Sequence, residues 1–120
     1  MAHKKNSYQY GIFAENIVAW GLRLRGYKIL AKRYKTPVGE IDLIASHKNI
    51  IIFIEVKARH NLSTALQALT PHMKKRIIRA AGYFIARHSA FSNYGMRFDL
   101  IAIAPPFYWE HLDNAWQVSV

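Results

Sequence analysis

Apolar side chains recur along the first part of the chain with the spacing of an α-helix. Between residues 7 and 25 they follow one another at intervals of three and four, which predicts a helix with one apolar stripe. The stripe consists of Phe13, Ile17, Trp20 and Leu24. Ser7 is suited to cap the amino end of this helix, and Gly26 is suited to end it. We expect the stripe to pack on the rest of the protein.

Strand patterns follow this helix. Segments 40–46 and 50–58 are rich in β-branched residues, and residues 47–49 provide the turn that joins them into a hairpin. Segment 27–34 predicts a basic edge strand before a turn at residues 36–39. Segment 96–103 predicts a later strand that Pro105-Pro106 ends, and one or two short strands follow around Tyr108 and Gln117.

A second helix is predicted over residues 70–88, with Thr70 as its N-cap and Pro71 in the first helical position. Segment 61–69, just before it, is a loop or an irregular helix. The order of helix, three strands, helix and two strands predicts one α/β domain over residues 1–120. In such a domain a mixed sheet carries helices on its faces.

The charge of the chain favours a polyanionic partner. Seventeen Lys and Arg against seven Asp and Glu give a net charge of +10, which favours DNA or RNA, although a soluble protein without such a partner can also be basic. Cysteine is absent, so the chain has neither a disulfide nor a thiolate. The amino end lacks the apolar core of a secretion signal, and the longest apolar run, residues 50–54, is far shorter than the roughly 20 residues of a membrane span. We expect a cytoplasmic protein that does not bind membranes.

The helix over residues 70–88 separates apolar from basic side chains. Its apolar face would pack on the sheet, and the opposite face carries Lys75, Arg76, Arg79 and Arg87. Such a face is often only a solvated surface, but no acid occurs between residues 59 and 98, so we expect it to bind phosphates. Lys74 points toward the sheet side, and Arg59 follows the second strand of the hairpin. Both are further candidates for nucleic-acid binding.

The hairpin brings acids and a lysine to one face. If its turn lies at residues 48–49, the strands are symmetric about that turn, so Asp42 faces Glu55 and Glu40 faces Lys57. Side chains alternate along a strand, so these four share a face, with opposed Cβ atoms about 5 Å apart. Two carboxylates at that distance repel each other, and a divalent cation between them relieves the repulsion. Mg²⁺ and Mn²⁺ prefer carboxylate oxygens, and Lys57 beside them would stabilise charge on a phosphate.

Ordinary ion pairs between strands are the alternative explanation of these charges. Glu40 would then pair with Lys57, and Asp42 with a lysine or arginine elsewhere. Against this, residues 50–54 are typical of a strand buried on both faces, where a charge without a function is costly. Asp99, two residues after Arg97 on the late strand, is interpreted as a structural partner.

Two segments of the hairpin resemble a known family. Gly-Glu-Ile-Asp-Leu-Ile-Ala at residues 39–45 and Phe-Ile-Glu-Val-Lys-Ala-Arg at residues 53–59 are similar to the YraN-like family of small uncharacterised proteins. That family is similar in turn to PD-(D/E)XK nucleases, in particular to archaeal Holliday junction resolvases. The resemblance extends over most of the chain, including Gly11 and Glu15 in the first helix and segments 26–30, 74–81 and 97–100. Ile41 stands where the superfamily motif has its proline, a position that takes no part in the chemistry.

This resemblance implies a restriction-endonuclease-like fold and a nuclease site. Asp42, Glu55 and the Val56 carbonyl would hold Mg²⁺ or Mn²⁺, Lys57 would be the catalytic lysine, and Glu15 would lie near the metal. The implied function is hydrolysis of phosphodiester bonds in DNA, including structure-specific cleavage of junctions in repair or recombination, by a homodimer. The alternative is a non-catalytic nucleic-acid-binding protein that retains the nuclease fold.

Overall fold

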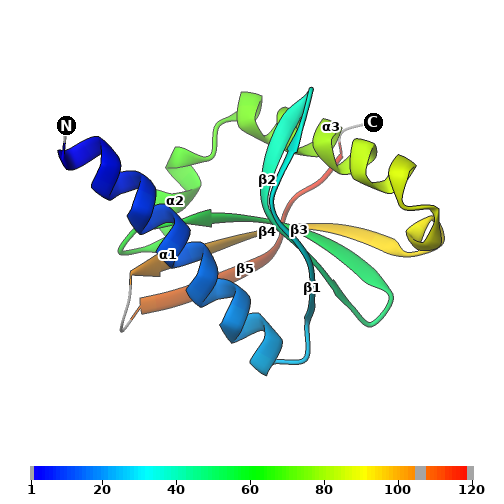
Figure 1. The fold of residues 1–120 in the computed structure, drawn as a ribbon, viewed down its shortest axis with the longest axis horizontal. Helices are drawn as coiled ribbons and strands as arrows, with labels where there is room; N and C mark the ends of the chain where they lie inside the picture. Colours follow the sequence, from blue (N-terminus) through cyan, green and yellow to red (C-terminus); the bar gives the residue numbers. More distant parts are fainter. Residues whose placement is uncertain (1, 105–107, 119–120) are drawn as a thin grey trace.

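A five-stranded sheet forms the centre of the molecule, with helices on both of its faces (Figure 1). The structure, a computed structural model, describes residues 2–104 and 108–118, with side chains from residue 8 onward. Its elements are α1 (Ala2–Leu24), β1 (Lys28–Thr36), β2 (Gly39–His47), β3 (Ile50–Lys57), α2 (Leu62–Ala68), α3 (Pro71–Arg87), the 3-10 turn η1 (Ser89–Phe91), β4 (Gly95–Ala104) and β5 (Tyr108–Trp116). The strands lie in sequence order, and all neighbours are antiparallel except β3 and β4. This is the predicted single α/β domain with a mixed sheet, and it is consistent with a restriction-endonuclease-like fold.

The predicted elements are present, with corrections at their ends. Helix α1 begins at Ala2, so Ser7 lies inside it and is not its N-cap; serine favours caps but is tolerated inside a helix. Segment 61–69 contains the regular helix α2, because the Asn61 side chain caps it by accepting the Thr64 N–H at 2.8 Å. The tail forms one nine-residue strand, β5, which ends before Gln117. The break predicted at residues 105–106 lies outside the described residues.

The β2–β3 hairpin has the predicted register. Leu43 lies opposite Ile54 and Ile44 opposite Phe53. Residues 48 and 49 both have positive φ, 51° and 63°, as the two central residues of a tight type I′ turn require. The paired segment ends at Leu43 and Ile54, so the next residue on each strand, toward the open end of the hairpin, is an acid.

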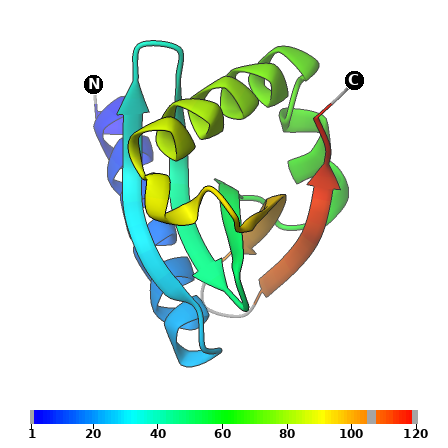
Figure 2. The same ribbon diagram turned by 90° about the vertical axis from the view of Figure 1, so that its right-hand side faces the viewer.

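Helices α1 and α3 pack on opposite faces of this sheet (Figure 2). Successive residues of β3 alternate between the two faces: Ile52 and Ile54 belong to the cluster that includes α1, while Ile51 and Phe53 belong to the cluster that includes α3. All four are fully buried, which confirms that this strand is buried on both faces. In the part of the chain that the structure describes, no helix is long and apolar enough to cross a membrane.

The apolar stripe predicted for α1 is not the main face by which this helix packs on the sheet. Phe13, Trp20 and Leu24 are 52%, 64% and 87% exposed, and only Ile17 of the stripe is partly buried against the core. The helix instead packs mainly through the side chains on its other face. Those buried residues are Ala14, Val18, Ala19 and Leu22. The small side chains bring the helix close to the sheet, and a Cβ on Gly21 would lie only 2.8 Å from the Trp109 ring. This orientation turns Glu15 inward, where it is buried.

Candidate functional site

Three acids and a lysine meet where β2 and β3 cease to pair. Asp42 comes from β2, Glu55 and Lys57 come from β3, and Glu15 reaches the same place from α1. Glu15 and Glu55 are each 8% exposed. Lys57 lies two residues after Glu55 on the same strand face, and its Nζ is 3.3 Å from Glu55 Oε2. The predicted acids and lysine are therefore brought together, with Glu15 among them.

The carboxyl groups of Asp42 and Glu55 are close enough for each to affect the ionisation of the other. Asp42 Oδ2 also accepts the Val56 N–H at 2.8 Å, so it lies across the end of β3. Burial, followed by the negative charge of Glu55, raises the pKa of Asp42 to about 8. Burial also raises the pKa of Glu55, although nearby Lys57 opposes the rise. At neutral pH the pair therefore retains a proton that ordinary carboxylates would have lost.

Glu15 joins this pair through its charge. Burial and the neighbouring Asp42 raise the pKa of Glu15 to about 7, although Arg33 Nη1 lies 2.9 Å from its Oε1. Arg33 has a φ of 50° within β1, a region that residues other than glycine rarely adopt. The register places it level with Asp42, between the Lys32–Leu43 and Tyr34–Ile41 pairs. The sequence did not distinguish Arg33 from the other cations, because no local signal predicts this backbone conformation for arginine.

The ion pairs formed at the site differ from those that the alternative explanation of its charges requires. Lys57 pairs with Glu55 on its own strand, whereas Glu40 lies 3.9 Å from Arg33, on the other neighbour of β2. Among the described residues Asp42 forms no ion pair with a lysine or arginine. The two pairs that the alternative explanation required, Glu40 with Lys57 and Asp42 with a cation, are therefore not formed among the described residues, although Glu15 and Glu55 each have a cationic partner.

The oxygen atoms of Asp42 and Glu55 suit a small hard cation that also takes ligands from water and from a substrate. Within the described residues, no three His, Cys, Asp or Glu side chains form a group that could hold a metal ion by itself. Asp42 and Glu55 offer two carboxylates, and a cation could replace the proton that they share. Mg²⁺ is commonly bound by one or two carboxylates together with water and substrate phosphate. The two residues therefore fit such an ion, and the ligand role of the Val56 carbonyl stays a prediction.

Two hollows open beside the acids. The smaller, about 160 Å³, lies between the hairpin and α3 and is lined by Glu40, Glu55, Met73, Arg76 and Ile77. The larger, about 370 Å³, lies between α1 and the end of β3 and is lined by Tyr10, Gly11 and residues 56–59. Glu55 lines the first and Lys57 the second, so the site can be approached from both sides.

Two of the predicted nucleic-acid-binding cations, Arg59 and Arg76, line these hollows. Helix α3 buries its apolar face, as predicted, and exposes Lys75, Arg76 and Arg79, of which Arg76 lines the smaller hollow. Lys74 is half-buried and lines neither hollow. Arg59 lines the larger hollow, and its guanidinium donates to the Ala58 carbonyl at 3.2 Å. Of the predicted nucleic-acid-binding cations, Arg76 and Arg59 are therefore the two that line the hollows at the site.

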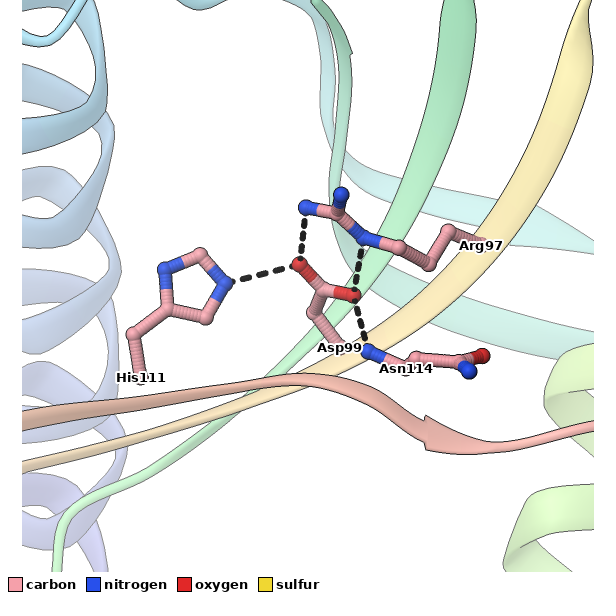
Figure 3. A network of polar contacts seen from close by, with 4 residues as sticks. All are labelled: Arg97, Asp99, His111 and Asn114. Atoms are coloured by element: carbon pink, nitrogen blue, oxygen red, sulfur yellow. Dashed lines mark hydrogen bonds and ion pairs between the residues drawn. The ribbon is translucent and has the colours of Figure 1, made fainter.

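A different buried acid, Asp99, lies on the α1 face of the sheet, and both of its carboxylate oxygens have hydrogen-bond partners (Figure 3). Asp99 is fully buried and accepts two hydrogen bonds of 2.8 Å from Arg97 and one of 3.0 Å from the Asn114 N–H, while His111 Nε2 lies 2.7 Å away. Burial opposes its ionisation, but these contacts together hold the pKa of Asp99 below its ordinary value. Asp99 therefore pairs with Arg97, as the sequence predicted, and joins β4 to β5.

Comparison with known proteins gives one family. The model of uncharacterised protein family UPF0102 matches residues 14–103. A UPF0102 protein of Bradyrhizobium diazoefficiens is 44% identical over 94% of this chain and 85% of its own length, and one of Rhodopseudomonas palustris (strain BisB5) is 43% identical over 94% and 86%. One of Paramagnetospirillum magneticum is 41% identical over 91% and 88%. The matched segment contains all four residues of the acidic site, and these names state no activity.

Proposed function

The chain belongs to the uncharacterised protein family UPF0102, in agreement with its resemblance to YraN-like proteins, and from its acidic site we propose that it is a metal-dependent nuclease acting on DNA. The observation that carries the proposal is the neighbouring pair of carboxyl groups of Asp42 and Glu55, with Lys57 Nζ 3.3 Å from Glu55 Oε2. The resemblance of the hairpin to PD-(D/E)XK nucleases supports the same conclusion. Structure-specific cleavage of DNA junctions, in the cytoplasm, is the form of activity that this resemblance implies.

The side chains have distinct tasks in this proposal. Asp42 and Glu55 hold a Mg²⁺ or Mn²⁺ ion, and the Val56 N–H fixes the orientation of Asp42 by donating to it. When bound, the cation acts as a Lewis acid on the phosphodiester and lowers the pKa of water. Lys57 keeps its ammonium beside the reacting phosphate and stabilises the negative charge that develops there. Glu15, with a pKa of about 7, can take up or release a proton next to Asp42 at neutral pH.

The charge on the surface supports a nucleic-acid substrate. The net charge is +10, and the exposed face of α3 presents Lys75, Arg76 and Arg79, of which Arg76 lines the smaller hollow. A duplex or single strand on this surface would place its phosphates near the acids. Carboxylates on a polyanion-binding surface repel the ligand unless a cation lies between them, so the acids and the basic face support the proposal together.

The test is Mg²⁺- or Mn²⁺-dependent cleavage of single-stranded, branched and linear DNA. We expect the wild type to cleave at least one of these, and Asp42→Ala to lose at least about 100-fold in rate, because a metal ligand is missing. Asp113→Ala, which removes an exposed acid of β5, is the matched control and should keep wild-type activity. Equal cleavage by the wild type and Asp42→Ala would end the proposal.

A non-catalytic nucleic-acid-binding protein is the second candidate. It is favoured by the finding that, in the described residues, no three acidic, histidine or cysteine side chains form a metal-holding group. Titration calorimetry separates the two candidates, because a nuclease should bind Mg²⁺ or Mn²⁺ through Asp42 whereas a pure binder should show no specific uptake. Complete loss of the heat signal in Asp42→Ala supports the nuclease.

Assembly as a homodimer, which the resemblance implies, stays a prediction. The exposed side chains Phe13, Trp20 and Leu24 on α1 supply apolar area that a second copy could cover. Light scattering should then give a particle of twice 13.9 kDa. A monomer mass at micromolar concentration contradicts the prediction.

A further inference from the structure

The larger hollow has a lining unlike that of the smaller one. It is about 370 Å³ in volume, and its wall consists of Tyr10 and Gly11 from α1 and residues 56–59 from the end of β3. Lys57 belongs both to this wall and to the acidic site, so the hollow begins directly beside the acids. Its volume lies within the range of about 300–1,000 Å³ that small-molecule sites occupy.

Aromatic and cationic side chains line this hollow together. The Tyr10 side chain is 43% exposed and is supported by Phe13, with ring centroids 6.3 Å apart and planes tilted by 39°. Lys57 and Arg59 supply two positive charges, and no acid is among the lining residues. A Cβ on Gly11 would meet nothing within 4 Å, so the wall beside Tyr10 opens to free space.

This combination suits one class of ligand. An exposed aromatic ring stacks on the face of a nucleobase, and cations beside it bind the phosphate of the same nucleotide. The bases of a continuous duplex are stacked on each other and do not offer their faces to a protein side chain. An unpaired nucleotide offers both its base face and its phosphate.

We propose that the hollow is a subsite for one unpaired nucleotide, whose base stacks on Tyr10 and whose phosphate contacts Lys57 and Arg59. The inference rests on the proposed function and narrows its substrate class. The neighbouring phosphodiester then lies at Asp42 and Glu55. Strands with an unpaired nucleotide at the cleaved position, such as single strands and flaps, are preferred to continuous duplex.

Fluorescence anisotropy in EDTA tests the subsite without cleavage. The probes are a labelled single-stranded oligonucleotide and a blunt duplex of the same length. We expect Tyr10→Ala to bind the single strand about 5- to 150-fold more weakly, because base stacking is lost, and to bind the duplex within about twofold of the wild type. Tyr10→Phe should bind both probes like the wild type, because it keeps the ring.

Tyr83→Ala is the matched control. Tyr83 also lies beside a cation, with the Arg87 guanidinium 4.0 Å from its ring centroid, but it is on α3 and does not line the hollow. This variant should leave the ratio of single-strand to duplex affinity unchanged. If Tyr10→Ala leaves the ratio of single-strand to duplex affinity unchanged, because it weakens the binding of both probes equally or of neither, the subsite proposal is wrong.

The nucleotide subsite and the nuclease activity can be refuted independently of each other. If Tyr10→Ala leaves the affinity ratio unchanged while the wild type cleaves DNA in an Asp42-dependent way, the subsite is wrong and the nuclease stands. If the wild type cleaves nothing but Tyr10→Ala removes the preference for single strands, the hollow is the nucleotide site of a binding protein.

Discussion

Replacing Asp42 by asparagine should stabilise the metal-free protein. The pKa of Asp42 rises from 3.8 to about 8 on folding, so the folded chain keeps a proton that the unfolded chain releases. Between about pH 4 and 8 stability therefore falls as pH rises, with an upper limit of about 4 kcal/mol at pH 7. Glu15 and Glu55 share the repulsion and readjust, so a gain of about 1–3 kcal/mol is expected. Asparagine imitates the protonated acid, since its oxygen can accept the Val56 N–H and its amide can donate to Glu55.

The assay is urea denaturation in EDTA, repeated between pH 4 and 8.5. The difference in free energy of unfolding between Asp42→Asn and the wild type should grow as pH rises and level off near pH 8. Adding Mg²⁺ should stabilise the wild type and leave the variant unchanged, because only the wild type binds the ion. A variant that is less stable than the wild type at pH 8 would refute the argument from burial and repulsion.

Three further changes test other parts of the structure. Asp99→Asn should lower the free energy of unfolding by about 2–4 kcal/mol in urea denaturation at pH 7, and this loss should shrink below about pH 4, where the unfolded wild-type chain takes up a proton at Asp99 while the lowered pKa of the folded state resists it. Gly39→Ala should lower it by about 1–3 kcal/mol, because the new Cβ would lie 2.6 Å from the Arg76 carbonyl oxygen; an unchanged melting temperature contradicts this. Joint replacement of Lys75 and Arg79 by alanine should reduce the slope of log affinity for DNA against log salt by about 2, whereas an unchanged slope would remove both from the binding surface.

The strands were predictable because their signals are local. Alternation and turn chemistry fixed the register of β2 and β3, and the positive φ of Lys48 and Asn49 follows from the short turn. The packing face of α1 was not predictable, because that helix is apolar on both sides. Its aromatic side is larger, but the sheet selects the small side chains that allow close approach, as the buried Ala14 and Val18 show.

In the candidate site, too, some features follow from local sequence signals and others do not. The meeting of Asp42 and Glu55 follows from strand register, and the place of Lys57 follows from alternation. The burial of Glu15 depends on how α1 is rotated, and its contact with Arg33 depends on a left-handed residue within β1. Both depend on tertiary packing, which a periodicity along one segment does not contain.

The two buried acidic sites differ in how their charge is compensated. Asp99 is surrounded by an arginine, a histidine and a main-chain N–H, which together lower its pKa (Figure 3). Asp42 receives only one main-chain N–H, so burial, together with the second carboxyl group that it faces, raises its pKa instead. Seventeen Lys and Arg are present in the chain, and one at the position of Glu55 would have compensated Asp42 as Arg97 compensates Asp99. Pairing two acids there costs stability, and a cation bound between them would offset that cost.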